Sequence, residues 1–144
     1  MQKDIIVRDA RESDSASISH LIEELGYSIT PLFISEYIRR ILGKTESRVV
    51  VAEVDSEVVG VFSLHIIPLL HKEKNLCRIT ALVVNEKYRG LGVGRKLVSF
   101  CEEYAKKSGC DRVEVTSRGH RMDAHRFYKM LGYEEVPKRF IKEI

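Results

Sequence analysis

A glycine-rich loop is the part of this sequence whose residue types point most directly to chemistry. It reads Arg89-Gly90-Leu91-Gly92-Val93-Gly94-Arg95 and stands between an apolar, β-branched run at 79–84 and a stretch with helical apolar spacing. A strand that enters a helix through glycines leaves several backbone N–H groups unpaired at the positive end of the helix dipole. Glycine also lets the backbone approach a ligand closely. The loop therefore predicts a binding site for a phosphate group.

The spacing of the glycines excludes two common phosphate-binding motifs. A dinucleotide-binding fingerprint needs a third glycine three residues after Gly-x-Gly, but those positions hold Arg95 and Leu97. A P-loop needs a glycine four intervening residues ahead of a Gly-Lys-Ser/Thr triplet, and the chain has no glycine in that position. What remains is a short pattern of arginine, two residues, glycine, one residue and glycine, carried by Arg89, Gly92 and Gly94.

A strand, a turn and a helix must position this loop, and the chain supplies further elements on both sides of it. Strands are predicted over residues 5–8, 49–54, 58–67, 79–84, 112–116, 133–136 and 139–144, with a hairpin turn at Asp55-Ser56. Helices are predicted from Ser13 or Asp14 to Gly26, from Thr30-Pro31 to Gly43, over 93–107 and over 122–131. Early hairpins and a late β-α-β crossover predict a mixed α/β fold, with a central twisted sheet of about seven strands and helices on both faces.

The whole chain, residues 1–144, is predicted to form a single domain, because its length suits one hydrophobic core. Its order of elements resembles that of the GNAT acyltransferases, and four sequence patterns agree with that family in the correct order. These are Val7-Arg8-Asp9-Ala10 with Asp14, Val59-Gly60, the strand and loop at 82–90, and the helix and following residues at 124–133. The chain is thus identified as a small, single-domain, bacterial-type member of the GNAT superfamily.

The resemblance implies that the chain binds acetyl-CoA (coenzyme A). The pyrophosphate would lie on the glycine loop, with Arg89 and Arg95 adding charge-assisted hydrogen bonds. The pantetheine arm would lie alongside residues 82–84 as an additional strand would. A backbone N–H there can also stabilise an oxyanion. The implied cofactor-binding residues are Leu82, Val83, Val84, Arg89, Gly90, Leu91, Gly92, Val93, Gly94 and Arg95.

The resemblance also implies acetyl transfer to an amine, with Tyr128 as the catalytic residue that meets the CoA sulfur. On periodicity alone Tyr128 belongs to a buried helical stripe, so its catalytic role comes from the resemblance. An amine of pKa about 10.4 must be deprotonated before it attacks, so a base is useful. The sequence offers His65 and Glu53, with His71 and His120 as weaker candidates.

Two positions depart from the family pattern and leave the base open. Many members carry an acidic residue early in the fourth strand, where this chain has Thr80. Many also carry an asparagine that touches the pantetheine arm, where this chain has Arg121. The leading function is N-acetyl transfer to a small-molecule primary amine by direct attack. The alternatives are acetylation of a protein lysine or N-terminus, and a non-catalytic acyl-CoA-binding or sensor module.

Composition sets the remaining expectations. A net charge of +3 suits an anionic cofactor and gives no reason to expect nucleic-acid binding. No apolar run approaches a membrane span, the N-terminus lacks a signal-peptide pattern, and three cysteines without C-x-x-C spacing predict no metal site. We therefore expect a cytoplasmic protein with no membrane partner. Apolar residues Phe140, Ile141 and Ile144 near a predicted sheet edge predict a homodimer.

Overall fold

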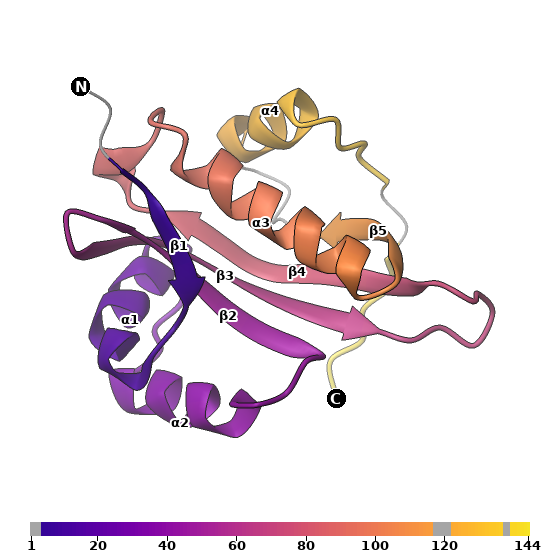
Figure 1. Cartoon of the computed structure of the whole chain (residues 1–144), viewed down its shortest axis with the longest axis horizontal. Helices are drawn as coiled ribbons and strands as arrows, with labels where there is room; N and C mark the ends of the chain where they lie inside the picture. The colour runs from indigo at the N-terminus through magenta and orange to yellow at the C-terminus, as the bar shows by residue number, and fades with distance from the viewer. Residues whose placement is uncertain (1–3, 117–121, 137–138) are drawn as a thin grey trace.

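A five-stranded mixed sheet separates two pairs of helices in the computed structural model, which describes residues 4–116, 122–136 and 139–144. The strand order is β1-β2-β3-β4-β5, antiparallel throughout except for the parallel β4–β5 pair. Helices α1 and α2 cover one face of the sheet, and α3 and α4 lie on the other (Figure 1). The elements are β1 Ile6–Asp9, η1 Glu12–Asp14, α1 Ser15–Glu23, α2 Pro31–Ile41, β2 Ser47–Val54, β3 Glu57–Ile67, β4 Asn75–Val84, η2 Glu86–Tyr88, α3 Val93–Lys107, β5 Cys110–Val115 and α4 Met122–Met130.

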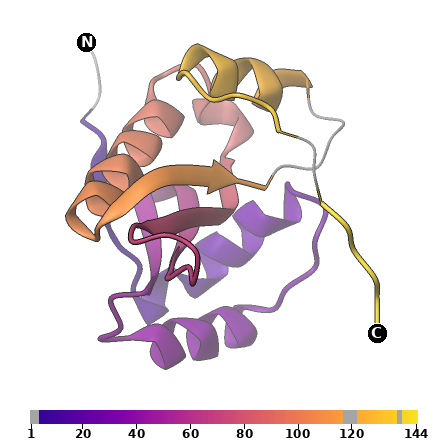
Figure 2. The same cartoon turned by 90° about the vertical axis from the view of Figure 1, so that its right-hand side faces the viewer.

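The prediction of about seven strands was wrong in number, because residues 133–136 and 139–144 form no strand. Figure 2 shows the last residues running away from the body of the molecule. Val136, Phe140, Ile141 and Ile144 are all exposed there. A strand is stabilised by cross-strand pairs and by burial of one face, and this segment has neither among the described residues. Apolar composition alone was therefore a poor guide at this end of the chain.

The other elements follow from local signals that the sequence contains. Thr30 caps α2 by accepting a hydrogen bond from the Phe33 N–H at 3.1 Å, and Pro31 occupies the first turn, as predicted. Asp55 and Ser56 both take left-handed φ values, 50° and 64°, and form the predicted hairpin turn between β2 and β3. Asp14 stands before α1, but its carboxylate accepts from Arg8 and the Arg11 N–H.

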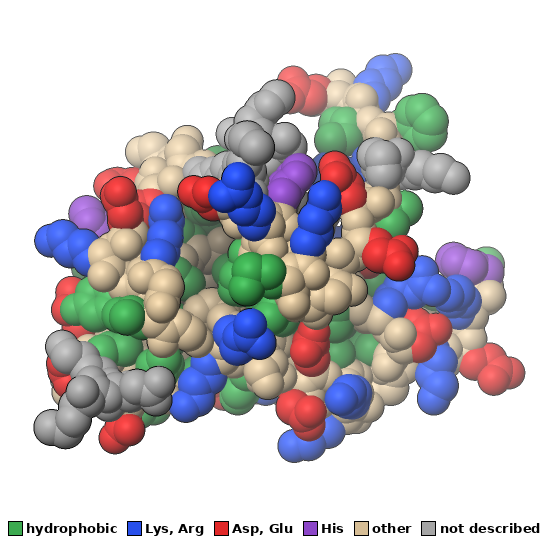
Figure 3. All heavy atoms as spheres, turned by 90° about the horizontal axis from the view of Figure 1, so that it is seen from above, with side chains coloured by type: hydrophobic (Ala, Val, Ile, Leu, Met, Phe, Trp, Pro, Cys, Tyr) green, Lys and Arg blue, Asp and Glu red, His purple; other side chains and the backbone are tan. Residues whose placement is uncertain are grey.

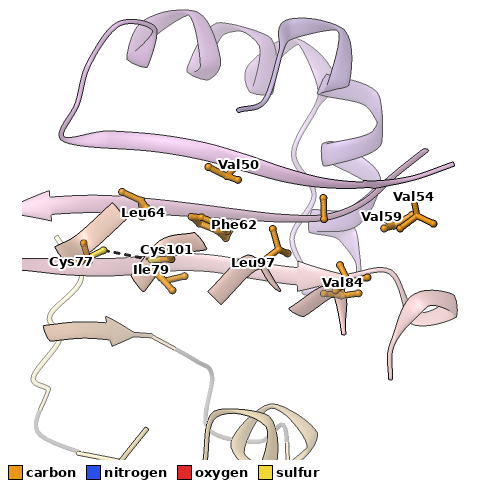
Figure 4. Close-up of a cluster of buried hydrophobic side chains, with 13 residues drawn as sticks. Val50, Val54, Val59, Phe62, Leu64, Cys77, Ile79, Val84, Leu97 and Cys101 are labelled. Atoms are coloured by element: carbon orange, nitrogen blue, oxygen red, sulfur yellow. Dashed lines mark hydrogen bonds between the residues drawn. The ribbon is translucent and has the colours of Figure 1, made fainter. Parts of the chain in front are cut away.

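Two apolar layers hold the sheet in place. The layer between the sheet and α3 includes Phe62, Leu64, Ile79 and Leu97, none of which is exposed (Figure 4). Cys77 of β4 faces Cys101 of α3 in this layer, with the two free thiols 3.7 Å apart. Both cysteines are therefore small packing residues of the core. The second layer lies beneath α1 and α2.

Candidate active site

Strand β4 has one edge that is paired for only part of its length. Its parallel pairing with β5 runs from Asn75 to Ile79, and the last bond joins the Thr116 N–H to the Ile79 carbonyl at 3.3 Å. The pairing with β3 skips Thr80, since Ser63 pairs with Ala81 and Leu64 with Ile79. Thr80 is therefore a bulge, and beyond it the β4 edge is open within the described part of the chain.

The register decides which backbone groups the open edge presents. The Asn85 N–H donates to the Val59 carbonyl on the β3 side at 2.8 Å. Backbone hydrogen-bonding groups alternate in direction along an antiparallel strand. Those of Ala81 and Val83 therefore also point to β3, and those of Leu82 and Val84 point to the open edge. Arg89 Nε already donates to the Val84 carbonyl at 3.2 Å. The predicted strand segment thus supplies backbone groups from Leu82 and Val84, and the Val83 side chain packs beneath α1 and α2.

The open edge leads through η2 into the glycine loop at the start of α3. Gly90 and Gly92 have left-handed φ values of 80° and 88°, and a Cβ added to either would meet no atom within 4 Å. Backbone conformation, not crowding by the protein, therefore requires glycine at both positions. The first helical bond runs from the Lys96 N–H to the Gly92 carbonyl, so the N–H groups of residues 93–95 precede it. The loop has the donors that an anion needs.

The two arginines predicted to bind the pyrophosphate, Arg89 and Arg95, differ in their contacts with the protein. Arg89 donates to the Val84 carbonyl and lies 3.8 Å from Glu24 of the α1 end, which also accepts from the Glu86 N–H. Arg95 is exposed on the first turn of α3, and Leu91 in the loop is exposed as well. Basic and acidic side chains are interspersed over the face seen in Figure 3. An anion at the loop would therefore be bound by local donors and not by a broad basic surface.

Gly94 lets α4 pack closely against the start of α3, beside the loop. A Cβ at Gly94 would lie 3.0 Å from Cζ of Phe127 on α4, which is tighter than most real Cβ contacts, so the Phe127 ring would have to shift. Val93, also predicted at the cofactor site, has its side chain in the core at 1% exposure, so only its backbone faces the loop. The close contact between Gly94 and Phe127 sets α4 beside the first turn of α3 (Figure 1).

Tyr128 follows Phe127 on α4 and is half-buried, with two aromatic rings beside it. Its ring centroid lies 5.2 Å from that of Phe127 and 5.8 Å from that of Tyr133. Burial raises the pKa of Tyr128 to about 12, so the phenol stays protonated at neutral pH. The Tyr133 hydroxyl donates to Glu102 at 2.8 Å, whereas no described residue hydrogen-bonds the Tyr128 hydroxyl. The phenol of Tyr128 is a neutral donor, and the supporting Tyr133–Glu102 pair had no signal in the sequence.

On the opposite face of the sheet, His65 belongs to a row of hydrogen-bonded side chains. Its Nδ1 lies 3.0 Å from Ser47 Oγ, its Nε2 lies 3.2 Å from Thr80 Oγ1, and Thr80 Oγ1 lies 2.7 Å from Ser63 Oγ. Burial, and secondarily the charge of Arg78, lowers the pKa of His65, so the imidazole is neutral near pH 7. The row passes through Thr80 at the bulge and ends at Ser63. The i, i+2 spacing of Ser63 and His65 on β3 was the sequence signal for it.

The other candidate bases are placed differently. Glu53 accepts from Arg8 Nε at 2.7 Å, and Arg8 also pairs with Asp14 at 2.8 Å. Burial alone would raise the pKa of Asp14, but hydrogen bonds from Arg8 and the Arg11 N–H outweigh it and lower that pKa. This cluster joins β1, β2 and the start of α1. His71 is exposed in the β3–β4 connection, and His120 and Arg121 lie outside the described residues.

A cavity of about 250 Å³ lies between the two N-terminal helices and the sheet. It is lined by Ile18, Ile22, Ile29, Phe33, Ile34, Tyr37, Ile38, Val49, Val61, Phe62, Ser63 and Ala81. Phe33 and Tyr37 stack with ring centroids 6.4 Å apart, and among the residues that the structure describes no charged side chain contributes to the wall. Ser63 and Ala81 place one end of the cavity beside the Thr80 bulge. The cavity is therefore a candidate acceptor site.

Within the residues that the structure describes, no three His, Cys, Asp or Glu side chains come together as a metal site would require. The described helices also include none with the length and apolar character needed to cross a membrane.

Comparison with known proteins gives a consistent result. The acetyltransferase (GNAT) family matches residues 14–133 of this chain. An aminoalkylphosphonate N-acetyltransferase of Salmonella typhimurium is 38% identical over 90 residues, which are 62% of this chain and 58% of that relative. An uncharacterized N-acetyltransferase of Chlorobaculum tepidum is 26% identical over 140 residues, 97% of this chain and 82% of that protein.

The fold is also that of solved acetyltransferases. An aminoglycoside N-acetyltransferase in complex with CoA superposes with a TM-score of 0.86, covering 100% of this chain and 97% of that one. At 14% sequence identity this likeness shows the fold alone. The chain spans little more than half of the Salmonella relative, at 58% of its length.

Proposed function

Because this chain belongs to the acetyltransferase (GNAT) family, we propose that it transfers the acetyl group of acetyl-CoA to a primary amine of a small molecule by direct attack. The observation that carries the proposal is the open edge of β4 running directly into the glycine loop at the start of α3. The Salmonella relative, which is named for aminoalkylphosphonates, supports a small-molecule amine as the acceptor.

The hydrogen-bonding groups at this edge suit the chemistry of acetyl-CoA. Leu82 and Val84 offer strand-like hydrogen-bonding groups to the amides of the pantetheine arm. The loop N–H groups of residues 93–95 and the helix dipole suit the pyrophosphate, with Arg95 free to add a charge-assisted bond. Left-handed Gly90 and Gly92 keep the loop surface clear of side chains at these donors. Acetyl-CoA supplies an acetyl thioester, whose oxygen would be stabilised by a backbone N–H such as that of Leu82.

Tyr128 is proposed to donate a hydrogen bond to the sulfur as negative charge develops on it. Its phenol is protonated at neutral pH, and no described residue competes for its hydroxyl. The Phe127 contact with Gly94 holds α4 at the loop and so orients the neighbouring Tyr128.

His65 is proposed to accept the proton of the amine, through Thr80 or a water molecule. Its neutral imidazole can accept a proton at pH 7, and the Thr80 hydroxyl links it to the bulge at the open edge. Glu53 is less suited to this role, because its carboxylate is held by Arg8. In this proposal the hydrogen-bonded row accepts the amine proton, which is the role of the acidic residue that many family members carry at the Thr80 position.

Acetyl-CoA binding and amine-dependent release of CoA test the proposed activity. A ligand that binds only the folded state stabilises it by about 2.7 kcal/mol at 100 times its Kd, so the melting temperature should rise by several degrees. NAD and ATP should give no such rise. A rise without CoA release from any amine or peptide would favour the sensor alternative, and release with lysine peptides alone would favour protein acetylation.

We also propose that the chain forms a homodimer in a reducing cytoplasm. Its C-terminal segment presents four exposed apolar side chains, Val136, Phe140, Ile141 and Ile144, and its thiols are free. The terminal strands predicted from the sequence do not form, so they supply no sheet edge. However, β5 is itself an edge strand.

A further inference from the structure

The chemistry of the cavity beneath α2 narrows the class of acceptor. Of the described side chains that line it, only those of Ser63 and Tyr37 carry a polar atom. Ser63 Oγ is already hydrogen-bonded to Thr80 at 2.7 Å. A charged group placed in this cavity would lose its hydration without gaining an ionic partner from the wall. An apolar group would meet mainly carbon atoms along the described wall.

The cavity is large enough for a ring or a short alkyl chain. An apolar cavity of about 150 Å³ accommodates benzene in a well-studied case. The cavity here measures about 250 Å³, which leaves room for a six-membered ring with a short linker. Phe33 and Tyr37, stacked on α2, form one wall and offer ring faces to such a group.

One end of the cavity meets the proposed reaction centre. Ala81 and Ser63 line the cavity and pair with each other across β4 and β3. The next residue, Leu82, faces the open edge where the acetyl thioester is proposed to lie. Thr80, on the other side of Ala81, is hydrogen-bonded to His65. An amine with its tail in the cavity would therefore present its nitrogen near both the open edge and the candidate base.

We propose that the acceptor is a primary amine on a short apolar tail, either alkyl or aryl, and that the tail binds in the cavity between α1, α2 and the sheet. This inference rests on the proposed N-acetyltransferase activity and specifies its substrate class. It separates this chain from enzymes whose acceptors carry several charges, including the aminoalkylphosphonates for which the Salmonella relative is named.

A panel of matched amines tests the proposal through acceptor-dependent release of CoA. Pentylamine and 1,5-diaminopentane share one carbon chain and differ at the far end, which is a methyl group in one and a charged amine in the other. 2-Phenylethylamine and 2-aminoethylphosphonate make a second pair with a ring or a phosphonate. We expect kcat/KM to be at least about tenfold higher for the apolar member of each pair. Equal or better turnover of either charged member would overturn the inference.

A variant of the cavity wall provides the second test. Phe33→Asp places a carboxylate at the wall, while Leu32→Asp places one on the neighbouring residue, which does not line the cavity. Phe33→Asp should lower kcat/KM for pentylamine by about tenfold or more and shrink its advantage over 1,5-diaminopentane. Leu32→Asp should leave both values near those of the unmodified protein. Equal effects of the two substitutions would contradict a tail in this cavity.

Failure of the inference can be told apart from failure of the proposed function. Stabilisation by acetyl-CoA with turnover of charged amines only would overturn the apolar acceptor and leave the N-acetyltransferase reaction standing. Stabilisation without turnover of pentylamine or 2-phenylethylamine would also overturn the acceptor class. Absence of both stabilisation and turnover would remove the proposed function and the inference together.

Discussion

Burial decides how Tyr128 can act. An ordinary phenol has a pKa of about 10, but burial raises that of Tyr128 to about 12. Full proton transfer to a thiolate of pKa about 8.5 would then cost roughly 5 kcal/mol, because each pKa unit is worth 1.36 kcal/mol. Donating a hydrogen bond while charge develops on sulfur avoids most of this cost. Tyr128 is therefore suited to donate a hydrogen bond to the sulfur and to keep its proton until the thiolate forms.

Tyr128→Phe should lower kcat by about 10²-fold, because it deletes the donor but keeps the ring and its packing. Acetyl-CoA affinity should change little, since the hydrogen bond strengthens only as charge develops. Initial rates with a good amine, together with cofactor affinity, check this. Tyr133→Phe is the matched control on a neighbouring ring. It loses the bond to Glu102, at a cost in stability on the order of 1 kcal/mol, and should keep its kcat. An unchanged kcat in Tyr128→Phe would make Tyr128 a packing residue.

The lowered pKa of His65 predicts two effects of pH. If His65 is the base, His65→Gln should lower kcat/KM by about 10²-fold and remove one ionisation from the acidic limb of the pH profile below about pH 6.5. His71→Gln, in an exposed connection, should change neither. An acidic limb that persists in His65→Gln would assign the ionisation to another group.

Stability should depend on the same group. The unfolded chain takes up a proton at His65 near pH 6.5, while the folded chain resists it to lower pH. The free energy of unfolding should therefore fall as pH falls from about 6.5 towards the folded pKa. Denaturant unfolding at several pH values should show less of this fall in His65→Gln. A steeper fall in the variant would contradict the lowered pKa.

At the scale of elements, the strand–loop–helix unit depends on backbone conformation more than on side chains. Leu82 and Val84 contribute backbone groups at the open edge, and Gly90 and Gly92 hold left-handed turns in open space. Gly94 instead lets Phe127 approach α3. The three glycines of one short motif therefore have two different roles. Substitutions at Gly90 and Gly92 should disturb the conformation of the loop, and a substitution at Gly94 should disturb the packing of α4 on α3.

Gly92→Ala should weaken acetyl-CoA binding by about tenfold or more. A left-handed φ of 88° costs an alanine roughly 1–2 kcal/mol, so the loop should relax away from the conformation that directs its N–H groups. Gly109→Ala, at a φ of 74° beyond the far end of α3, imposes a similar strain away from the loop. Both variants should lose a similar amount of stability, measured by thermal unfolding. Equal acetyl-CoA affinity in the two variants would count against the loop as the pyrophosphate site.

At the scale of the molecule, two apolar layers bury the sheet on both faces, yet the C-terminal segment leaves apolar side chains in solvent. Phe140 and Ile144 are fully exposed and lie beyond the last helix. Burying such side chains releases about 25 cal/mol per Å² of apolar surface, so an isolated chain gains nothing from them. A second copy of the chain would supply the surface that they lack.

Sedimentation should therefore show a dimer at micromolar concentration. Phe140→Asp combined with Ile144→Asp should shift the protein towards monomer, because it puts charge into the proposed contact. Leu42→Asp, at an exposed apolar residue just after α2, is the control and should stay dimeric. A monomer at all concentrations in the unmodified protein would refute the dimer.

The sequence by itself determined most of the elements and the nature of the loop. Thr30-Pro31, Asp55-Ser56 and the glycines at 92 and 109 act through local geometry, which depends only on near neighbours in the chain. The near-continuous apolar runs of β2 and β3 likewise follow from burial on both sheet faces. Where neighbours in sequence set the conformation, reading the sequence was sufficient.

Tertiary structure decided what depends on partners far along the chain. Residues 133–136 and 139–144 resembled strands, but a strand needs an edge to pair with, and none receives them here. The β4 register and its Thr80 bulge select Leu82 and Val84 for the open edge. Packing from α2 builds an apolar cavity beside Ser63 and Ala81, and Arg8 binds Glu53 while His65 joins Thr80. Local sequence does not show which distant residues such contacts join, because each contact arises only when segments far apart in the chain are brought together by the fold.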